Sequence, residues 1–182
     1  MNEREFLNRT ANGQGDFLAE FIAVLEAQHV PFCLIGGLAV NAYAEPVVSL
    51  DMDVVVIADQ LDELVDVLQT RFTVRRFPHS VNVSSPLSDL RLQIQTDGRY
   101  QPFVRRAARR TVLGYELPVA ALEDVLQGKL WAYADETRRP SKRQKDLADI
   151  LRLAETHPHL AEMLPGSIRN MLEGASYAKD QY

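Results

Sequence analysis

Apolar and polar positions along the chain predict alternating helices and strands up to about residue 120 and helices alone beyond it. Apolar residues recur at helical spacing after Asp16, which is a suitable helix cap, and again over residues 60–71. Short apolar runs bounded by glycine or proline have the length of strands. We expect strands at 31–35, 50–58 and 89–96, one or two short strands at 72–83 around Pro78, and a strand at 111–119 that is broken at Gly114. We also expect a short helix at 38–44 and further helices at about 120–135, 141–156 and 167–173.

This order of elements is typical of an α+β fold. We expect a core of strands and helices in residues 16–119, with a mixed sheet, and a C-terminal helical part in residues 120–182 packed on that core. Residues 1–15 are polar and contain two glycines, so we expect a flexible lead-in there. The strand at 50–58 is apolar on both sides after its opening residues, which indicates a central position in the sheet.

Two glycines and two aspartates stand close together in the chain. The apolar run Phe32–Ile35 leads into Gly36 and Gly37, and the strand at 50–58 opens with Asp51 and Asp53. Residues i and i+2 of a strand project to the same side, so the two carboxylates lie together and repel unless a cation or a shared proton offsets them. Carboxylates suit Mg²⁺, which completes its shell with substrate phosphates, and glycines let the backbone approach a phosphate.

The combination therefore predicts a site for a metal-bound nucleotide. Taken singly, a glycine pair is more often a turn, and two aspartates at this spacing are often a solvated strand end. It is the ordered succession of strand, Gly36-Gly37, helix, and Asp51 and Asp53 at the start of the next strand that carries the prediction.

This succession resembles the nucleotidyltransferase superfamily related to DNA polymerase beta. The segments Leu122–Lys129 and Arg138–Leu151 also look like those of its compact bacterial branch, which includes the AbiEii-type toxins, and the resemblance covers roughly residues 16–155. It implies a nucleotidyltransferase-like mixed sheet. It also implies that Asp51 and Asp53 are catalytic metal ligands and that Gly36 and Gly37 bind nucleotide.

Lys129 interrupts an apolar helical stripe that contains Leu126 and Tyr133. Burying a lysine is costly unless its charge finds a partner, so the side chain either reaches into the cleft or extends to solvent. The resemblance favours the cleft, where Lys129 would bind triphosphate and take part in catalysis. Arg143, one turn before the next apolar stripe, either contacts phosphate or caps the edge of the core, and Asp146 is placed to form a structural ion pair with Lys129 or Arg143.

The resemblance also implies a third carboxylate on the strand beside Asp51 and Asp53. Residues 89–96 alternate, with Leu90, Leu92 and Ile94 on one face, and they offer Gln93 at the aligned position. An amide cannot act as a base. Asp89 has the same parity as Gln93 but lies about 13 Å away along the strand, so it would replace the missing carboxylate only in a different register.

Composition adds a charge asymmetry to this picture. Residues 99–145 hold eleven of the twenty Lys and Arg residues but only five acidic ones, within a chain of net charge −5. A basic surface beside an acidic metal site suits a polyanionic substrate, although two solvated basic helix ends would give the same count. Few aromatic residues stand among these arginines, so base stacking is not indicated there.

The remaining composition bounds the location of the protein. No apolar run approaches the roughly 20 residues that cross a bilayer, so no membrane partner is expected. Residues 1–15 lack the apolar segment of a signal peptide, and the single cysteine, Cys33, stands in an apolar run typical of a core thiol. We expect a cytoplasmic protein.

The resemblance implies transfer of a nucleoside monophosphate from an NTP to a hydroxyl of RNA, such as a tRNA end, or of a protein, with Mg²⁺ or Mn²⁺ as cofactor. It also suggests a toxin with a cognate antitoxin as partner. Because Gln93 replaces the third carboxylate, a second hypothesis is a catalytically impaired module that binds nucleotide or a partner on the same fold.

Overall fold

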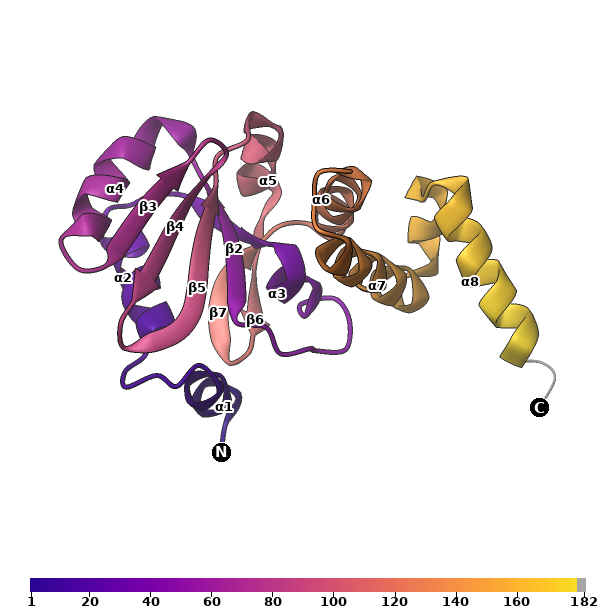
Figure 1. The fold of residues 1–182 in the computed structure, drawn as a ribbon, viewed down its shortest axis with the longest axis horizontal. Coiled ribbons are helices and arrows are strands. Elements are labelled where there is room, and N and C mark those ends of the chain that lie inside the picture. Colours follow the sequence, from indigo (N-terminus) through magenta and orange to yellow (C-terminus); the bar gives the residue numbers. More distant parts are fainter. Residues whose placement is uncertain (180–182) are drawn as a thin grey trace.

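The protein is described by a computed structural model for residues 1–179. Within these residues, seven strands form one mixed sheet in the order β3-β4-β5-β2-β1-β7-β6 (Figure 1). The strands are β1 (Phe32–Ile35), β2 (Asp51–Val56), β3 (Thr73–Phe77), β4 (Ser80–Ser85), β5 (Ser88–Gln95), β6 (Ala108–Val112) and β7 (Tyr115–Val119). β2 runs parallel to β5 and β1 runs parallel to β7, whereas the other neighbours are antiparallel.

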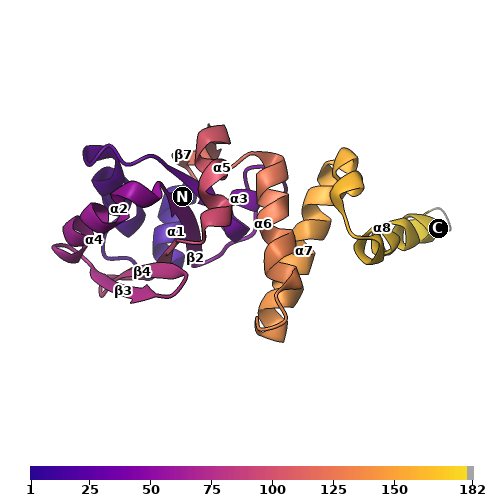
Figure 2. The same cartoon turned by 90° about the horizontal axis from the view of Figure 1, so that it is seen from above.

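The helices surround one face and one end of this sheet. They are α1 (Glu3–Thr10), α2 (Phe17–Ala27), α3 (Gly36–Val40), α4 (Leu61–Gln69), α5 (Gln101–Arg106), α6 (Leu122–Ala134), α7 (Pro140–Thr156) and α8 (Gly166–Lys179), with single 3₁₀ turns at Ala58–Gln60, Gly98–Tyr100 and Pro158–Met163. Viewed from above, the molecule is elongated: the sheet and its helices come first, α6 and α7 follow, and α8 lies at the far end (Figure 2).

The two faces of the β3–β5 part of the sheet differ in character. Val81, Val83, Leu92 and Ile94 are buried and belong to the main apolar cluster, together with residues of α2 and α4. These two helices lie behind the strands in Figure 1, and no helix of the described residues covers the front face of β3 and β4 (Figures 1 and 2). The front face is therefore the one on which a ligand can lie.

The α+β fold and most of its elements agree with the sequence analysis. Asp16 caps α2 by accepting a hydrogen bond from the backbone N–H of Ala19, and β2 is the central strand of the sheet. β5 alternates as expected, with Leu90, Leu92 and Ile94 buried. Of the two possibilities for 72–83, one strand or two, the structure has two, β3 and β4, and it adds the helix α5, for which the sequence analysis made no prediction.

The first residues differ from the sequence prediction. Residues 1–15, expected as a flexible lead-in, contain the helix α1, because Asn2 and Glu5 form a reciprocal cap at its start. Leu7 and Ala11 are buried in the main apolar cluster, and the backbone N–H of Gln14 donates to the carbonyl of Leu87. Two apolar residues that pack into the core form too weak a pattern to be recognised within a polar segment.

Two expectations from composition can be compared with the structure. Cys33 is buried, and burial raises the pKa of its thiol to about 12, as befits a core residue. Among the described residues, no helix combines the length and apolar character that crossing a membrane requires.

Candidate functional site

The turn from β1 into α3 brings the backbone against the second aspartate of β2. Ile35 pairs with Asp53 across the antiparallel strands, and Gly36 follows with φ of +70°. A Cβ atom built on Gly36 would lie 2.3 Å from the Asp53 carboxylate, far inside van der Waals contact. Gly36 is therefore required twice, by its backbone conformation and by the approach of Asp53.

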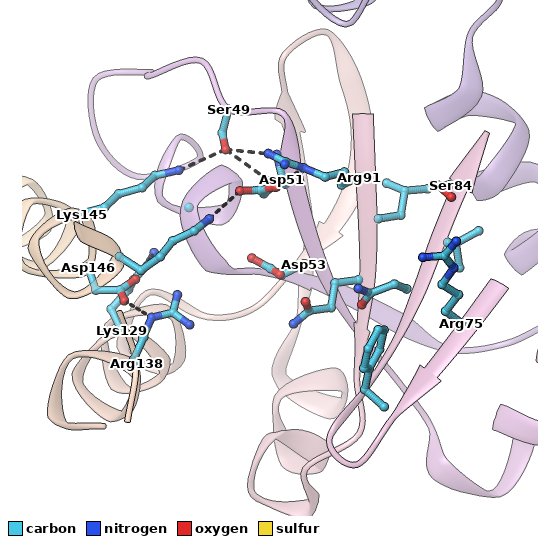
Figure 3. Close-up of a pocket in the computed structure, with 17 residues that line it drawn as sticks. Ser49, Asp51, Asp53, Arg75, Ser84, Arg91, Lys129, Arg138, Lys145 and Asp146 are labelled. Carbon is cyan, nitrogen blue, oxygen red and sulfur yellow. Dashed lines mark hydrogen bonds and ion pairs between the residues drawn. The ribbon is translucent and has the colours of Figure 1, made fainter. Parts of the chain in front are cut away.

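Asp51 is held by two cations. Its Oδ1 lies 2.7 Å from Arg91 Nε on β5, and its Oδ2 accepts a hydrogen bond of 2.9 Å from Lys142 Nζ on α7 (Figure 3). Burial opposes ionisation of this carboxyl, but Lys142 and Arg91 outweigh it and lower the pKa of Asp51 below its ordinary value. Asp51 is thus an anion that links the sheet to the C-terminal helices.

Asp53 differs from Asp51 although it stands only two residues away. No hydrogen bond or ion pair joins its carboxylate to the described residues, and Figure 3 shows it between the side chains of α6 and α7 and those of the strands. Burial raises the pKa of Asp53, and the nearby charge of Lys129 offsets this only in part. A buried carboxylate without a hydrogen-bond or ion-pair partner is stabilised by any cation that binds beside it.

Lys129 stands at the centre of a buried charge cluster between α6 and α7. Its Nζ lies 3.0 Å from Asp146 Oδ1 and 2.7 Å from Asp149 Oδ2, and all three side chains are less than a tenth exposed. Arg138 and Arg152 pair with the outer oxygens of the two aspartates. Burial disfavours the charged amine, but the two carboxylates outweigh it and raise the pKa of Lys129, which is therefore a cation.

Gly37 lies next to this cluster and has no side chain that would shield its backbone from it. A Cβ atom at Gly37 would meet Asp149 Oδ2 at 3.6 Å, Lys145 Nζ at 3.8 Å and Lys129 Nζ at 3.9 Å, all ordinary contact distances. The bare backbone of Gly37 thus faces two ammonium groups, of which Lys129 is already paired with the nearby Asp149 carboxylate. A bare backbone beside the second ammonium group, that of Lys145, is a position at which phosphate oxygens can bind.

These groups line one cavity of about 520 Å³, a size usual for small-molecule sites. Six basic side chains and three carboxylates border it among the described residues, namely Arg75, Arg91, Lys129, Arg138, Lys142, Lys145, Asp51, Asp53 and Asp146. The cavity is bounded by β2–β5 on one side and by α6 and α7 on the other (Figure 3). Its excess of positive charge suits a polyanionic ligand.

Most of the predicted site residues line the cavity or the smaller one beside it. Gly37, Asp51, Asp53, Gln93, Lys129 and Asp146 all line the main cavity, and Gly36 lines a smaller adjoining one of about 80 Å³. Gln93 stands directly opposite Asp53 in the parallel register of β2 and β5, the position at which the resemblance implies a third carboxylate. Asp146 pairs with Lys129, one of the two partners proposed for it.

Two of the predicted residues lie elsewhere. Arg143, expected to contact nucleotide, does not line the cavity. Its Nε donates a hydrogen bond to the backbone carbonyl of Tyr133, and its guanidinium lies over the aromatic ring of the same tyrosine. The rotation of about 100° per residue along α7 turns Lys142 and Lys145 toward the cavity and Arg143 toward α6. Asp89 accepts a hydrogen bond from Asn12 and is not a substitute for the missing third carboxylate.

Several cavity residues were missed in the sequence. Arg75 and Arg91 come from outside the basic segment 99–145, whereas Arg106 of that segment pairs with Asp124. Arg91 was detectable, since it shares the parity of Gln93 on an alternating strand. Arg75 was not, because only the sheet order brings β3 to the same face.

The donor set is compatible with a divalent cation that also binds phosphate. Asp53 offers an unpaired carboxylate, and Asp51 projects to the same side of β2. The described residues contain no group of three or more acidic, histidine or cysteine side chains arranged to hold a metal ion. A cation such as Mg²⁺ would therefore take its remaining ligands from phosphate oxygens and water, which is its usual habit.

Comparison with known proteins gives one family and one fold. The family described as nucleotidyl transferase AbiEii toxin of type IV toxin–antitoxin systems matches residues 16–176. No curated protein matches the chain in sequence.

Three solved structures share the fold at low sequence identity. The antibiotic-resistance factor ANT(2'')-Ia, in complex with adenylyl-2''-tobramycin, is 13% identical over 89% of this chain and 95% of its own, with a TM-score of 0.53. The lincomycin-bound lincosamide adenylyltransferase LnuA is 12% identical over 78% and 98%, with a TM-score of 0.52. An antigenic nucleotidyltransferase-like protein from Paracoccidioides brasiliensis is 18% identical over 76% and 74%, with a TM-score of 0.50.

Proposed function

The chain belongs to the family of AbiEii nucleotidyltransferase toxins, and from this premise we propose that it transfers a nucleoside monophosphate from an NTP to a hydroxyl group of RNA. The observation that carries the proposal is the pair Asp51 and Asp53 at the edge of a cavity with six basic side chains. The carboxylates suit a divalent cation, and the basic side chains suit the triphosphate that this cation accompanies.

The residues on the two sides of the cavity have different parts in this reaction. We place the triphosphate against the bare backbone of Gly37 and the ammonium groups of Lys145 and Lys129, which stabilise the negative charge of the leaving pyrophosphate. The acceptor oxygen attacks the α-phosphorus in line, the bond from that phosphorus to the bridging oxygen breaks, and pyrophosphate leaves. The hydroxyl proton passes to water, because Gln93 is neutral and cannot accept it.

Asp51 and Asp53 would hold the divalent cation, Mg²⁺ or Mn²⁺. When bound, it supplies charge neutralisation on the phosphate oxygens and orients the α-phosphate for attack. Arg91 and Lys142 each pair with one oxygen of Asp51, and each of those oxygens keeps a second lone pair with which it would bind the cation. Lys142 also borders the cavity, so its ammonium group would stabilise phosphate charge beside the cation.

Charge favours RNA as the acceptor. The structurally similar ANT(2'')-Ia was crystallised with an adenylylated tobramycin, which is a polyamine and hence a cation. A cavity bordered by six basic side chains against three carboxylates repels such an acceptor and attracts a polyanion. A protein hydroxyl remains the second acceptor to be tested.

We further propose that the transfer serves a toxin role counteracted by a cognate antitoxin, on the strength of the family alone. Induced expression should arrest growth of the host, and the Asp53→Asn variant should not. Arrest by both forms would contradict an enzymatic toxin.

The test of the transfer is incubation with each α-labelled NTP, Mg²⁺ or Mn²⁺, total RNA and cell protein. We expect label on RNA with the wild type and none with Asp53→Asn, which keeps the size of the side chain but not its charge. Asp59→Asn removes an exposed carboxylate outside the cavity and should leave transfer unchanged. Label on protein would replace RNA as the acceptor in this proposal.

The alternative is a binding module that has lost turnover at Gln93. It would bind nucleotide with Mg²⁺ yet transfer no label. Because Gln93 pairs directly with Asp53, the variant Gln93→Glu adds a third carboxylate to the same group. Transfer that appears only in Gln93→Glu would establish the alternative, and transfer by the wild type would exclude it.

A further inference from the structure

Polar side chains from four neighbouring strands form one row that ends at Asp53. In the register of the sheet, Arg75 on β3 stands opposite Asn82 on β4, and Asn82 stands opposite Gln93 on β5. Gln93 in turn stands opposite Asp53 on β2. Neighbouring strands are about 4.8 Å apart, so the row extends about 14 Å from the carboxylate across the open face of the sheet.

The side chains of this row have no partners among the residues that the structure describes. Arg75, Asn82 and Gln93 make no side-chain hydrogen bond or ion pair with the described residues, and Oδ1 of Asn82 is buried without a donor. A buried acceptor without a donor, here Oδ1 of Asn82, carries a desolvation cost that a ligand can offset. Arg75 is exposed and Gln93 is half-buried, so both side chains are open to a ligand. Three polar side chains in line with Asp53 point to a ligand that approaches along the row.

Phe77 adds an apolar surface to the outer end of the row. It lies two residues after Arg75 on the same strand, so both side chains project to the same face, and both line the cavity. Phe77 is 51% exposed, and no other aromatic ring among the described residues packs against it. An exposed ring beside arginines is the arrangement on which single-stranded bases stack.

We propose that Arg75, Phe77, Asn82 and Gln93, together called the acceptor row, bind the single-stranded 3′ end of the RNA acceptor. This inference rests on the proposed function and assigns its acceptor to one face of the sheet. Phe77 stacks on a base, Arg75 contacts the phosphate beside it, and the amides of Asn82 and Gln93 hydrogen-bond base or ribose next to the reacting hydroxyl.

A single strand fits better than a duplex or a protein. A cavity of about 520 Å³ has the size of a small-molecule site, so the end of a single strand can enter it but a paired helix cannot. The row consists of three polar side chains and one ring, that of Phe77, so it gives a protein side chain little apolar surface. The net positive border also favours phosphates over a neutral peptide.

The experiment measures binding of two fluorescein-labelled hairpin RNAs, one with a short 3′ single-stranded tail and one with a blunt end, without NTP. The sequence supplies a matched control in the next residue: Arg76 has the same charge, but it points to the other face and pairs with Asp62. The variants are Arg75→Ala, Phe77→Ala, Asn82→Ala and the control Arg76→Ala. Phe77→Trp retains the stacking surface.

We expect Arg75→Ala and Phe77→Ala each to weaken binding of the tailed hairpin about tenfold, from the usual contribution of a stacked base or a phosphate contact. Arg76→Ala should stay within about twofold of the wild type, as a surface pair allows, and Phe77→Trp should bind at least as well as the wild type. The blunt hairpin should bind weakly and alike to all forms.

Equal losses in Arg75→Ala and Arg76→Ala, or equal affinity for both hairpins, would overturn the acceptor row. In the transfer assay, Phe77→Ala should raise the KM for RNA and leave the KM for NTP unchanged. The binding assay contains no NTP, so intact tail-specific binding without transfer would refute the proposed function alone. Label found on RNA, with RNA binding insensitive to the substitutions at Arg75, Phe77 and Asn82, would refute this inference alone.

Discussion

The close approach of Gly36 and Asp53 restricts which residue type each of the two positions accepts. Any side chain on Gly36 would meet the Asp53 carboxylate, and the φ of +70° is itself unfavourable for other residues. Gly37, by contrast, has ordinary contact distances around a virtual Cβ atom. The first glycine is therefore required for the fold of the turn, whereas the second leaves the backbone open toward Lys145 and Lys129.

Substitution of the first glycine should cost stability. We expect Gly36→Ala to lower the free energy of unfolding by about 2 kcal/mol, the sum of an unfavourable backbone conformation and displacement of Asp53. Urea unfolding followed by circular dichroism measures it. Gly98→Ala is the control, because its Cβ atom would meet nothing within 4 Å. A Gly36→Ala protein as stable as Gly98→Ala would contradict the strained turn.

At the scale of elements, the pair α6 and α7 depends on a buried charge cluster as well as on apolar packing. Lys129 enters from α6, and Asp146 and Asp149 enter from α7. Leu126, Ile150 and Leu153 beside them are fully buried. Because burial of one unpaired charge is costly, each member of the cluster holds the other two in place.

Removal of the central charge should destabilise this pair of helices. We expect Lys129→Met, which keeps most of the aliphatic chain, to lower the free energy of unfolding by about 3 kcal/mol. Lys145→Met, on the exposed side of α7, should change it by less than about 1 kcal/mol. Chemical denaturation measures both, and in a double-mutant cycle Asp146→Asn should cost less beside Lys129→Met than alone. Strictly additive losses would contradict a coupled cluster.

At the scale of the whole molecule, the N-terminal segment is tied to the far strands by Asp16. This carboxylate caps α2, pairs with Arg4 of α1 at 2.6 Å and accepts a hydrogen bond of 2.8 Å from the hydroxyl of Tyr115 on β7. Burial opposes its ionisation, but the bonds from Ala19, Arg4 and Tyr115 outweigh it and lower the pKa of Asp16 below the ordinary 3.8.

The direction of this shift sets a pH dependence of stability. A carboxyl with a lowered pKa in the folded state stabilises the fold above its ordinary pKa, and the contribution is lost as the pH falls through the folded value. Asp16→Asn keeps the capping oxygen and should be about 1 kcal/mol less stable than the wild type at about pH 7. The difference should be smaller at about pH 3, because that pH lies below the ordinary pKa of 3.8. Urea unfolding at both pH values measures it.

Two outcomes separate charge from hydrogen bonding at Asp16. Tyr115→Phe removes the hydroxyl donor but leaves the pair with Arg4, so part of the pH dependence should persist. A difference between wild type and Asp16→Asn that is the same at both pH values would contradict the proposed linkage.

Local patterns determined much of the fold and the centre of the site. Three patterns depend only on neighbours along the chain: the helical spacing after Asp16, the apolar strands and the alternation of β5. The succession of Gly36, Gly37, Asp51 and Asp53 is local as well, and the structure brings these four residues together at the site. Gln93 opposite Asp53 was also foreseeable, because the parity of a strand fixes which of its residues share a face.

The sequence by itself did not reveal the partners of those residues. Arg75 reaches the cavity only because β3, β4, β5 and β2 are adjacent in this order, and Arg143 turns away only because α7 packs on α6 at one particular rotation. Contacts between elements distant in sequence arise from packing, which no local period encodes. The chain alone therefore determined the paired aspartates, and the tertiary structure decided which cations surround them and which face of the sheet stays open.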